Sequence, residues 1–179
     1  MMEGLDRSFD AVVFIGYHAR AGTPDAIIDH TSSGNVTDFA INGVSLPEAG
    51  YNALIATHYG VPVVFVAGDQ AVVEQVQELF GEVETVATKE GIGAASNGLH
   101  PEAAAERIRA GVADAVNNRD RYGLFDLGKP YTLTLKLKTE QSVWNGSWFP
   151  GARRTGDWEL TYTGDEILEV MYAFNVMKR

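Results

Sequence analysis

The chain has 179 residues and 45% apolar content, which fits one domain, or one domain with a small appendage. Its formal net charge of −10 is spread along the sequence and repels phosphate backbones and anionic lipids, so we expect no nucleic-acid or membrane partner. The absence of cysteine excludes disulfides, thiolate nucleophiles and thiolate metal ligands. Because no apolar stretch is long enough to cross a bilayer and the N-terminus lacks signal-peptide features, the sequence predicts a cytoplasmic protein.

The first half of the sequence alternates short apolar runs with helical patterns. It predicts five elements in chain order: strands over 11–15 and 36–41, a helix over 47–58, a strand over 61–66 and a helix over 70–80. The first of these runs, Ala-Val-Val-Phe-Ile, is typical of a buried strand and ends just before the segment Gly16-Tyr17-His18. The second meets the turn signal Asn42-Gly43, which predicts a hairpin.

The second half predicts a change of architecture. A strand over 83–88, a loop over 89–93 and a helix from His100-Pro101 continue the alternating order, which favours a parallel sheet flanked by helices. Apolar and polar residues then alternate strictly over 131–137, as in a strand with one face in water. This pattern returns at Trp158, Leu160 and Tyr162, before a last helix from about Asp165. We therefore expect an α/β fold with a mostly parallel sheet, divided into an α/β domain, 1–122, and a β-rich C-terminal subdomain, 123–179.

Three polar residues are candidates for chemistry. His18 follows a strand, and ligands of open α/β sheets bind beyond the carboxyl ends of the strands; the alternative is a histidine hydrogen-bonded in a loop. His30 lies in a polar loop and is either functional or simply exposed. Glu48, in the first turn of a predicted helix, either binds a ligand or complements the helix dipole. Two imidazoles and a carboxylate are ligands of hydrolytic zinc sites, although their spacing matches no compact motif.

The other two histidines have structural interpretations. His58 falls inside the helix predicted over 47–58, and His100 stands where the N-cap of a helix is expected. We therefore expect both to be structural and not to bind a ligand.

Six segments of the chain match a known family in the same order along nearly its whole length. They are EGLDRSFDAVVFIGYHARAGTP, DHTSSG, INGVSLPEAGYNA, YGVPVVFVAGD, TVATKEGIG with LHPEAA, and FPGARRTGDWELTYTG. In these segments the chain resembles the zinc-dependent D-aminopeptidases of the DppA type. The resemblance implies an enzyme that hydrolyses the N-terminal residue of short peptides or related amides of D-amino acids, within a ring-like homo-oligomer.

The resemblance also implies roles for individual residues. The GYHA motif makes His18 a metal ligand, the DHTSSG loop makes His30 the catalytic histidine, and the glutamate before the GxNA motif makes Glu48 a second metal ligand. The asparagine of GxNA, Asn52, is implied to bind substrate. The cofactor is implied to be zinc, dinuclear in the complete family site.

The resemblance covers only the C-terminal two-thirds of the family's chain. The Asp-x-Glu-Gly and Asn-Asp-Ser-His metal motifs of the family do not occur in this sequence, so we expect it to supply only His18 and Glu48 of the metal ligands. Two ligands are too few for a catalytic zinc, so we expect the chain to be inactive alone unless another polypeptide or subunit supplies the remainder. Two further interpretations stay open: a non-catalytic relative that binds peptides or acts as an oligomer scaffold, and one half of a split enzyme.

Overall fold

The computed structural model describes residues 1–179 and divides into two compact units, each built from separate stretches of the chain. Unit 1 comprises Met1–Ala19, Thr23–Asp29 and Glu48–Asp126, and unit 2 comprises Arg20–Gly22, His30–Pro47 and Leu127–Arg179. The sequence patterns, by contrast, predict a single boundary after residue 122. No helix in either unit combines the length and the apolar character needed to cross a membrane.

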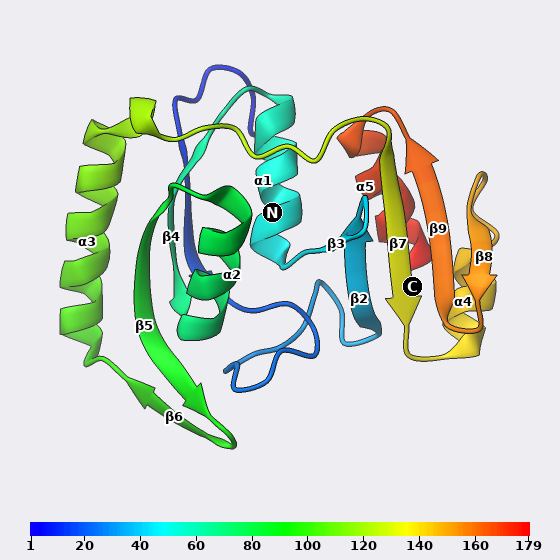
Figure 1. Ribbon diagram of the computed structural model, residues 1–179, viewed down its shortest axis with the longest axis horizontal. Helices are drawn as coiled ribbons and strands as arrows, with labels where there is room; N and C mark the ends of the chain where they lie inside the picture. Colours follow the sequence, from blue (N-terminus) through cyan, green and yellow to red (C-terminus); the bar gives the residue numbers. More distant parts are fainter. The chain divides into compact units, whose positions relative to one another are not determined.

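Unit 1 is built on a four-stranded sheet in the order β1-β4-β5-β6 (Figure 1). The first three strands are parallel, and β6 is antiparallel to β5. The strands are β1 (Val12–Tyr17), β4 (Val63–Asp69), β5 (Glu84–Ile92) and β6 (Ala95–Gly98). The helices are α1 (Glu48–His58), α2 (Gln70–Phe80), α3 (Pro101–Asn117) and the short 3-10 helix Arg119–Arg121. The predicted α/β class with a mostly parallel sheet is confirmed.

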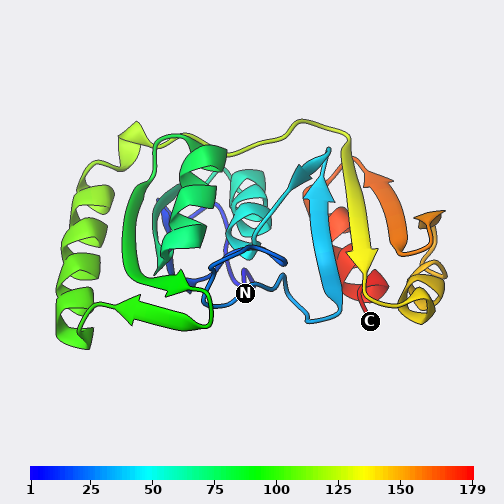
Figure 2. The same ribbon diagram turned by 60° about the horizontal axis from the view of Figure 1, so that its bottom comes forward.

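The core of unit 1 lies on both faces of β4, which is buried along its whole length. Residues of α1 and α2 pack against one face, around Phe14 and Val66, and α3 packs against the other, around Phe65. Figure 2 shows the sheet between α3 and the pair formed by α1 and α2. Gly68 lets β4 approach the end of β1 closely, because a Cβ there would lie 2.1 Å from the carbonyl oxygen of Tyr17. This approach fixes the backbone directly before His18.

One prediction for unit 1 is wrong. Residues 89–93 were expected to form a loop, but β5 continues to Ile92 and pairs with β6 as a hairpin. The turn is made by Gly93, whose φ is +58° and whose N–H donates to the Asp25 carboxylate over 2.9 Å. Because the extension is polar and largely exposed, it carries none of the apolar alternation that marks a half-buried strand.

Unit 2 is built on a five-stranded antiparallel sheet in the order β3-β2-β7-β9-β8. Its elements are β2 (Val36–Ile41), β3 (Val44–Ser45), β7 (Tyr131–Leu137), α4 (Glu140–Gly146), β8 (Arg153–Gly156), β9 (Glu159–Gly164) and α5 (Ile167–Met177). The predicted hairpin at Asn42-Gly43 is confirmed, with both residues at positive φ. The strand β2 thus joins a sheet whose other long strands lie about a hundred residues later.

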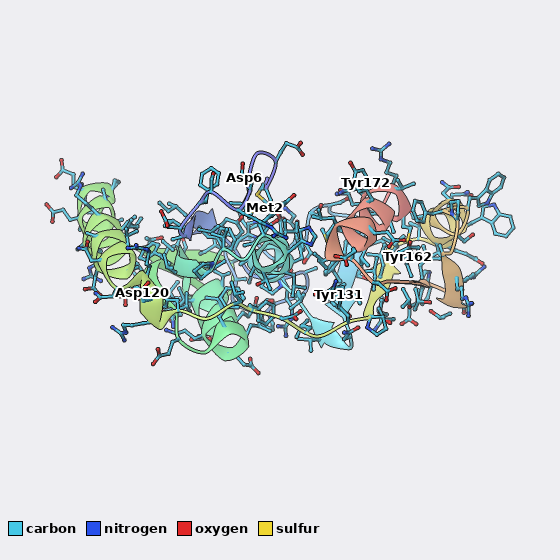
Figure 3. The ribbon with its side chains drawn as sticks, turned by 90° about the horizontal axis from the view of Figure 1, so that it is seen from above. Met2, Asp6, Asp120, Tyr131, Tyr162 and Tyr172 are labelled. Atoms are coloured by element: carbon cyan, nitrogen blue, oxygen red, sulfur yellow. The ribbon has the colours of Figure 1, made fainter.

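The core of unit 2 lies between this sheet and α5. Phe39 of β2 meets Phe174 of α5 edge to face, with ring centroids 4.7 Å apart. Figure 3 shows Tyr131 and Tyr162 on the strands and Tyr172 on α5, where its side chain is exposed. Leu160 is buried as the alternation predicts, but Trp158 lies just before β9 and is exposed. The helix α4 and the strand β8 were not predicted from the sequence.

Candidate metal centre

His18 stands directly after β1, and its ring orientation is set by the next residue. The His18 Nδ1 atom lies 3.2 Å from the carbonyl oxygen of Ala19. Because a carbonyl oxygen only accepts, we assign the proton of the neutral ring to Nδ1, which leaves the Nε2 lone pair available to a metal. Metal-binding histidines usually donate a hydrogen bond from the N–H of the second ring nitrogen in this way.

Glu48 is the first residue of α1, and its carboxylate is buried. The Tyr51 hydroxyl donates a hydrogen bond of 3.1 Å to Glu48 Oε2. The other oxygen, Oε1, lies 3.7 Å from Nε2 of His18. This separation exceeds a normal hydrogen bond, but it is close to the roughly 3.3 Å between two ligand atoms of one tetrahedral zinc ion.

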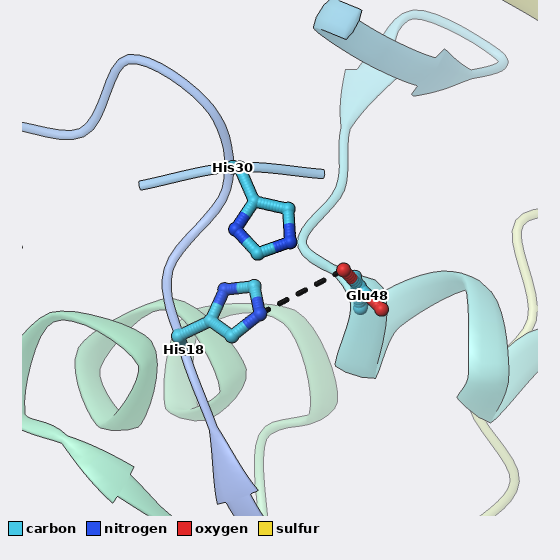
Figure 4. Close-up of side chains that lie close together, drawn as sticks. All are labelled: His18, His30 and Glu48. Atoms are coloured by element: carbon cyan, nitrogen blue, oxygen red, sulfur yellow. Dashed lines mark ion pairs between the residues drawn. The ribbon is translucent and has the colours of Figure 1, made fainter. Parts of the chain in front are cut away.

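His30 follows Asp29, whose backbone bridges Ala19, the residue after His18. The backbone of Ala19, next to His18, is therefore paired with that of Asp29, next to His30. One ligand atom each from His18, His30 and Glu48 lies within 4.8 Å of the other two (Figure 4). The three candidate residues of the sequence analysis are thus brought together, and two imidazoles and a carboxylate are a donor set suited to zinc.

Asp69, at the end of β4, anchors the loop that leads to His30. Its Oδ2 accepts from the backbone N–H of Ile27 over 3.0 Å, and its Oδ1 accepts from the N–H of Val72 over 3.0 Å. The second bond caps the N-terminus of α2. The sequence places a carboxylate at this strand end, but the bond to Ile27 spans 42 residues and has no local signal.

Asn52 lies one turn after Glu48 on α1 and is almost fully buried. Its Nδ2 donates to the Tyr17 hydroxyl over 3.1 Å, which ties α1 to the end of β1. Burial raises the pKa of Tyr17 to about 12, and the nearby Glu48 charge acts in the same direction while the Asn52 hydrogen bond opposes it. The Tyr17 phenol is therefore neutral at physiological pH.

The remaining two histidines lie in structural positions. His100 is the N-cap of α3, and its Nδ1 accepts from the Glu102 N–H over 3.4 Å. His58 is the last residue of α1, and its ring meets Tyr59 edge to face. Tyr17 and Tyr51 are the residues near the centre that sequence reasoning missed, because an aromatic residue in a strand or helix pattern is usually explained by packing.

A donor set of two histidines and one glutamate, with one histidine directly after a parallel strand, is typical of metal-dependent hydrolases. The family model described as D-aminopeptidase matches residues 1–176. The D-aminopeptidase of Bacillus subtilis (strain 168) is 33% identical over 180 residues, covering 99% of this chain. The chain belongs to the D-aminopeptidase family, peptidase family M55.

A solved structure supports the same assignment. It is described as the Zn-dependent D-aminopeptidase DppA from Bacillus subtilis, a self-compartmentalizing protease, and it matches with a TM-score of 0.94 at 32% identity over 99% of this chain. The chain spans 65% of the length of each of these two relatives.

Proposed function

We propose that this protein is a zinc-dependent aminopeptidase that removes the N-terminal residue from short peptides of D-amino acids. The single observation that carries the proposal is the convergence of His18, His30 and Glu48, with one ligand atom of each within 4.8 Å of the others. The membership of the chain in the D-aminopeptidase family supports the reaction and the class of substrate.

Each residue has a proposed role in this reaction. His18, through Nε2, and Glu48, through Oε1, would hold zinc, which when bound polarises the scissile carbonyl and lowers the pKa of a bound water. His30 transfers a proton during the reaction. Asn52 contributes to substrate binding, and its bond to Tyr17 holds its side chain in a fixed orientation. The dinuclear arrangement implied by the family resemblance stays a prediction.

We also propose that the protein assembles as a homo-oligomer. The support is the description of the Bacillus subtilis structure as a self-compartmentalizing protease, a term for assemblies that enclose their active sites. The active form then contains several copies of this chain, and its substrates are peptides short enough to enter.

The test is hydrolysis of paired amide substrates. Zinc-loaded protein is incubated with the p-nitroanilides of D-alanine and L-alanine, and release of nitroaniline is followed with and without a chelator. We expect cleavage of the D-enantiomer, loss of that cleavage on chelation and recovery with added zinc. Cleavage of neither substrate, or equal cleavage that persists with chelator, contradicts the proposal.

A further inference from the structure

The Tyr51 hydroxyl has no role in the function proposed above, yet it is buried against one of the proposed ligands. Tyr51 lies three residues after Glu48 on α1, so both side chains extend from the same face of the helix. The tyrosine is only 5% exposed and Glu48 only 7%. Between them runs the 3.1 Å hydrogen bond from the Tyr51 hydroxyl to Oε2.

This hydrogen bond makes the two carboxylate oxygens of Glu48 differ in their partners. Oε2 accepts from Tyr51, whereas Oε1 is the atom that lies 3.7 Å from Nε2 of His18. The terminal torsion of a glutamate is broad and has no strong preferred orientation of its own. A donor fixed on one oxygen therefore decides which oxygen faces His18.

We propose that Tyr51 is a positioning residue that presents Glu48 to zinc through Oε1 alone. The inference rests on the proposed zinc site. His18 is held in the equivalent manner, with Nδ1 bound to the Ala19 carbonyl and Nε2 directed at Glu48. Each of these two ligands thus has its second polar atom held by the protein, and such outer contacts raise metal affinity by restricting ligand orientation.

The test compares Tyr51→Phe, which removes only the hydroxyl oxygen, with Tyr59→Phe, which removes the same atom just beyond the far end of α1. Zinc affinity is measured by competition with a chromophoric chelator, and the visible spectrum of the cobalt(II) form reports ligand geometry. We expect Tyr51→Phe to weaken zinc binding about tenfold and to change the cobalt bands. Tyr59→Phe should match wild type in both measurements.

Glu48→Gln separates this inference from the metal site itself. If Glu48→Gln loses zinc affinity but Tyr51→Phe keeps the wild-type affinity and spectrum, the positioning role is wrong and the site stands. If Glu48→Gln binds zinc as wild type does, the proposed site is wrong and the inference falls with it. Thermal unfolding of the metal-free variants checks the fold, and the cobalt spectrum still decides if Tyr51→Phe is moderately destabilised.

Discussion

His30 differs from the other two proposed site residues in how its surroundings constrain it. Glu48 is buried on a helix and His18 follows the strand β1, but His30 lies half-buried in a polar loop. A side chain in such a place contributes little apolar burial to stability. We therefore expect stability and activity to be separable at this position.

We expect His30→Ala to change the free energy of unfolding by less than about 1 kcal/mol. The same change should lower turnover of a D-amino-acid anilide by about 10²-fold to 10⁴-fold, as for loss of a general acid or base. Denaturant unfolding and steady-state kinetics on the same preparation give both values. A large loss of stability with unchanged turnover would instead make His30 a structural residue.

Burial of Tyr17 makes the stability of the fold decrease as the pH rises into the alkaline range. Its pKa is about 12 in the folded protein, chiefly through burial, and about 10 in an unfolded chain. The folded state therefore holds the phenolic proton where the unfolded state has lost it, so stability is full below pH 10 and falls from about pH 10 to 12. We expect the melting temperature of Tyr17→Phe to fall less steeply over this range than that of wild type; equal slopes would contradict the assignment.

The identities of the site residues could be predicted from the sequence, but their contacts could not. His18, His30 and Glu48 follow from donor chemistry, from their places in predicted elements and from the family resemblance. The roles assigned to them, and to Asn52, stay predictions. The bonds from Tyr51 to Glu48 and from Asn52 to Tyr17 depend on side-chain rotamers and on the packing of α1 against β1, which no local pattern records.

At the scale of elements, the junction of β4 and α2 also holds the loop that precedes His30. The side chain of Asp69 at this junction caps α2 through Val72 and holds the N–H of Ile27 in the loop before His30. Because the Asp69 side chain is buried, its removal leaves these N–H groups without their acceptor, which is costly.

We expect Asp69→Ala to destabilise unit 1 by about 2 to 4 kcal/mol, from the lost cap and the lost bond to Ile27. Asp69→Asn should cost less, because its amide oxygen still caps the helix. Gln70→Ala, at a more exposed position where the side chain bonds only to Glu74, should change stability by less than about 0.5 kcal/mol. Denaturant unfolding of the three variants checks this order, and an Asp69→Ala protein as stable as Gln70→Ala would contradict it.

Helices and strands with a periodic apolar pattern can be predicted from the sequence, whereas those without such a pattern cannot. The strand β4 and the helix α2 have strong patterns, and the structure contains both. The hairpin of β5 and β6 extends into largely exposed residues, and β8 is exposed along most of its length. These strands are held by backbone hydrogen bonds, which do not require a particular pattern of side chains in the sequence.

For the whole molecule, the division into units depends on pairings between distant parts of the chain. Phe39 pairs with Leu135 across β2 and β7, which draws residues 30–47 into unit 2. Local periodicity identifies both strands but not which strands pair, so the sequence predicts a single boundary after 122 where the structure has discontinuous units. The family resemblance, by contrast, spans the chain and is confirmed by the family model and by the structural match.

The central claim is that His18 and Glu48 hold zinc with His30 beside it, and the four histidines of the chain allow a direct test. Zinc is titrated into ¹⁵N-labelled protein while the histidine ring resonances are followed by long-range ¹H–¹⁵N correlation spectra. We predict that the ring nitrogens of His18 and His30 shift with zinc, whereas those of His58 and His100 stay unchanged. Unchanged His18 and His30 resonances, or zinc shifts confined to His58 and His100, would contradict the account.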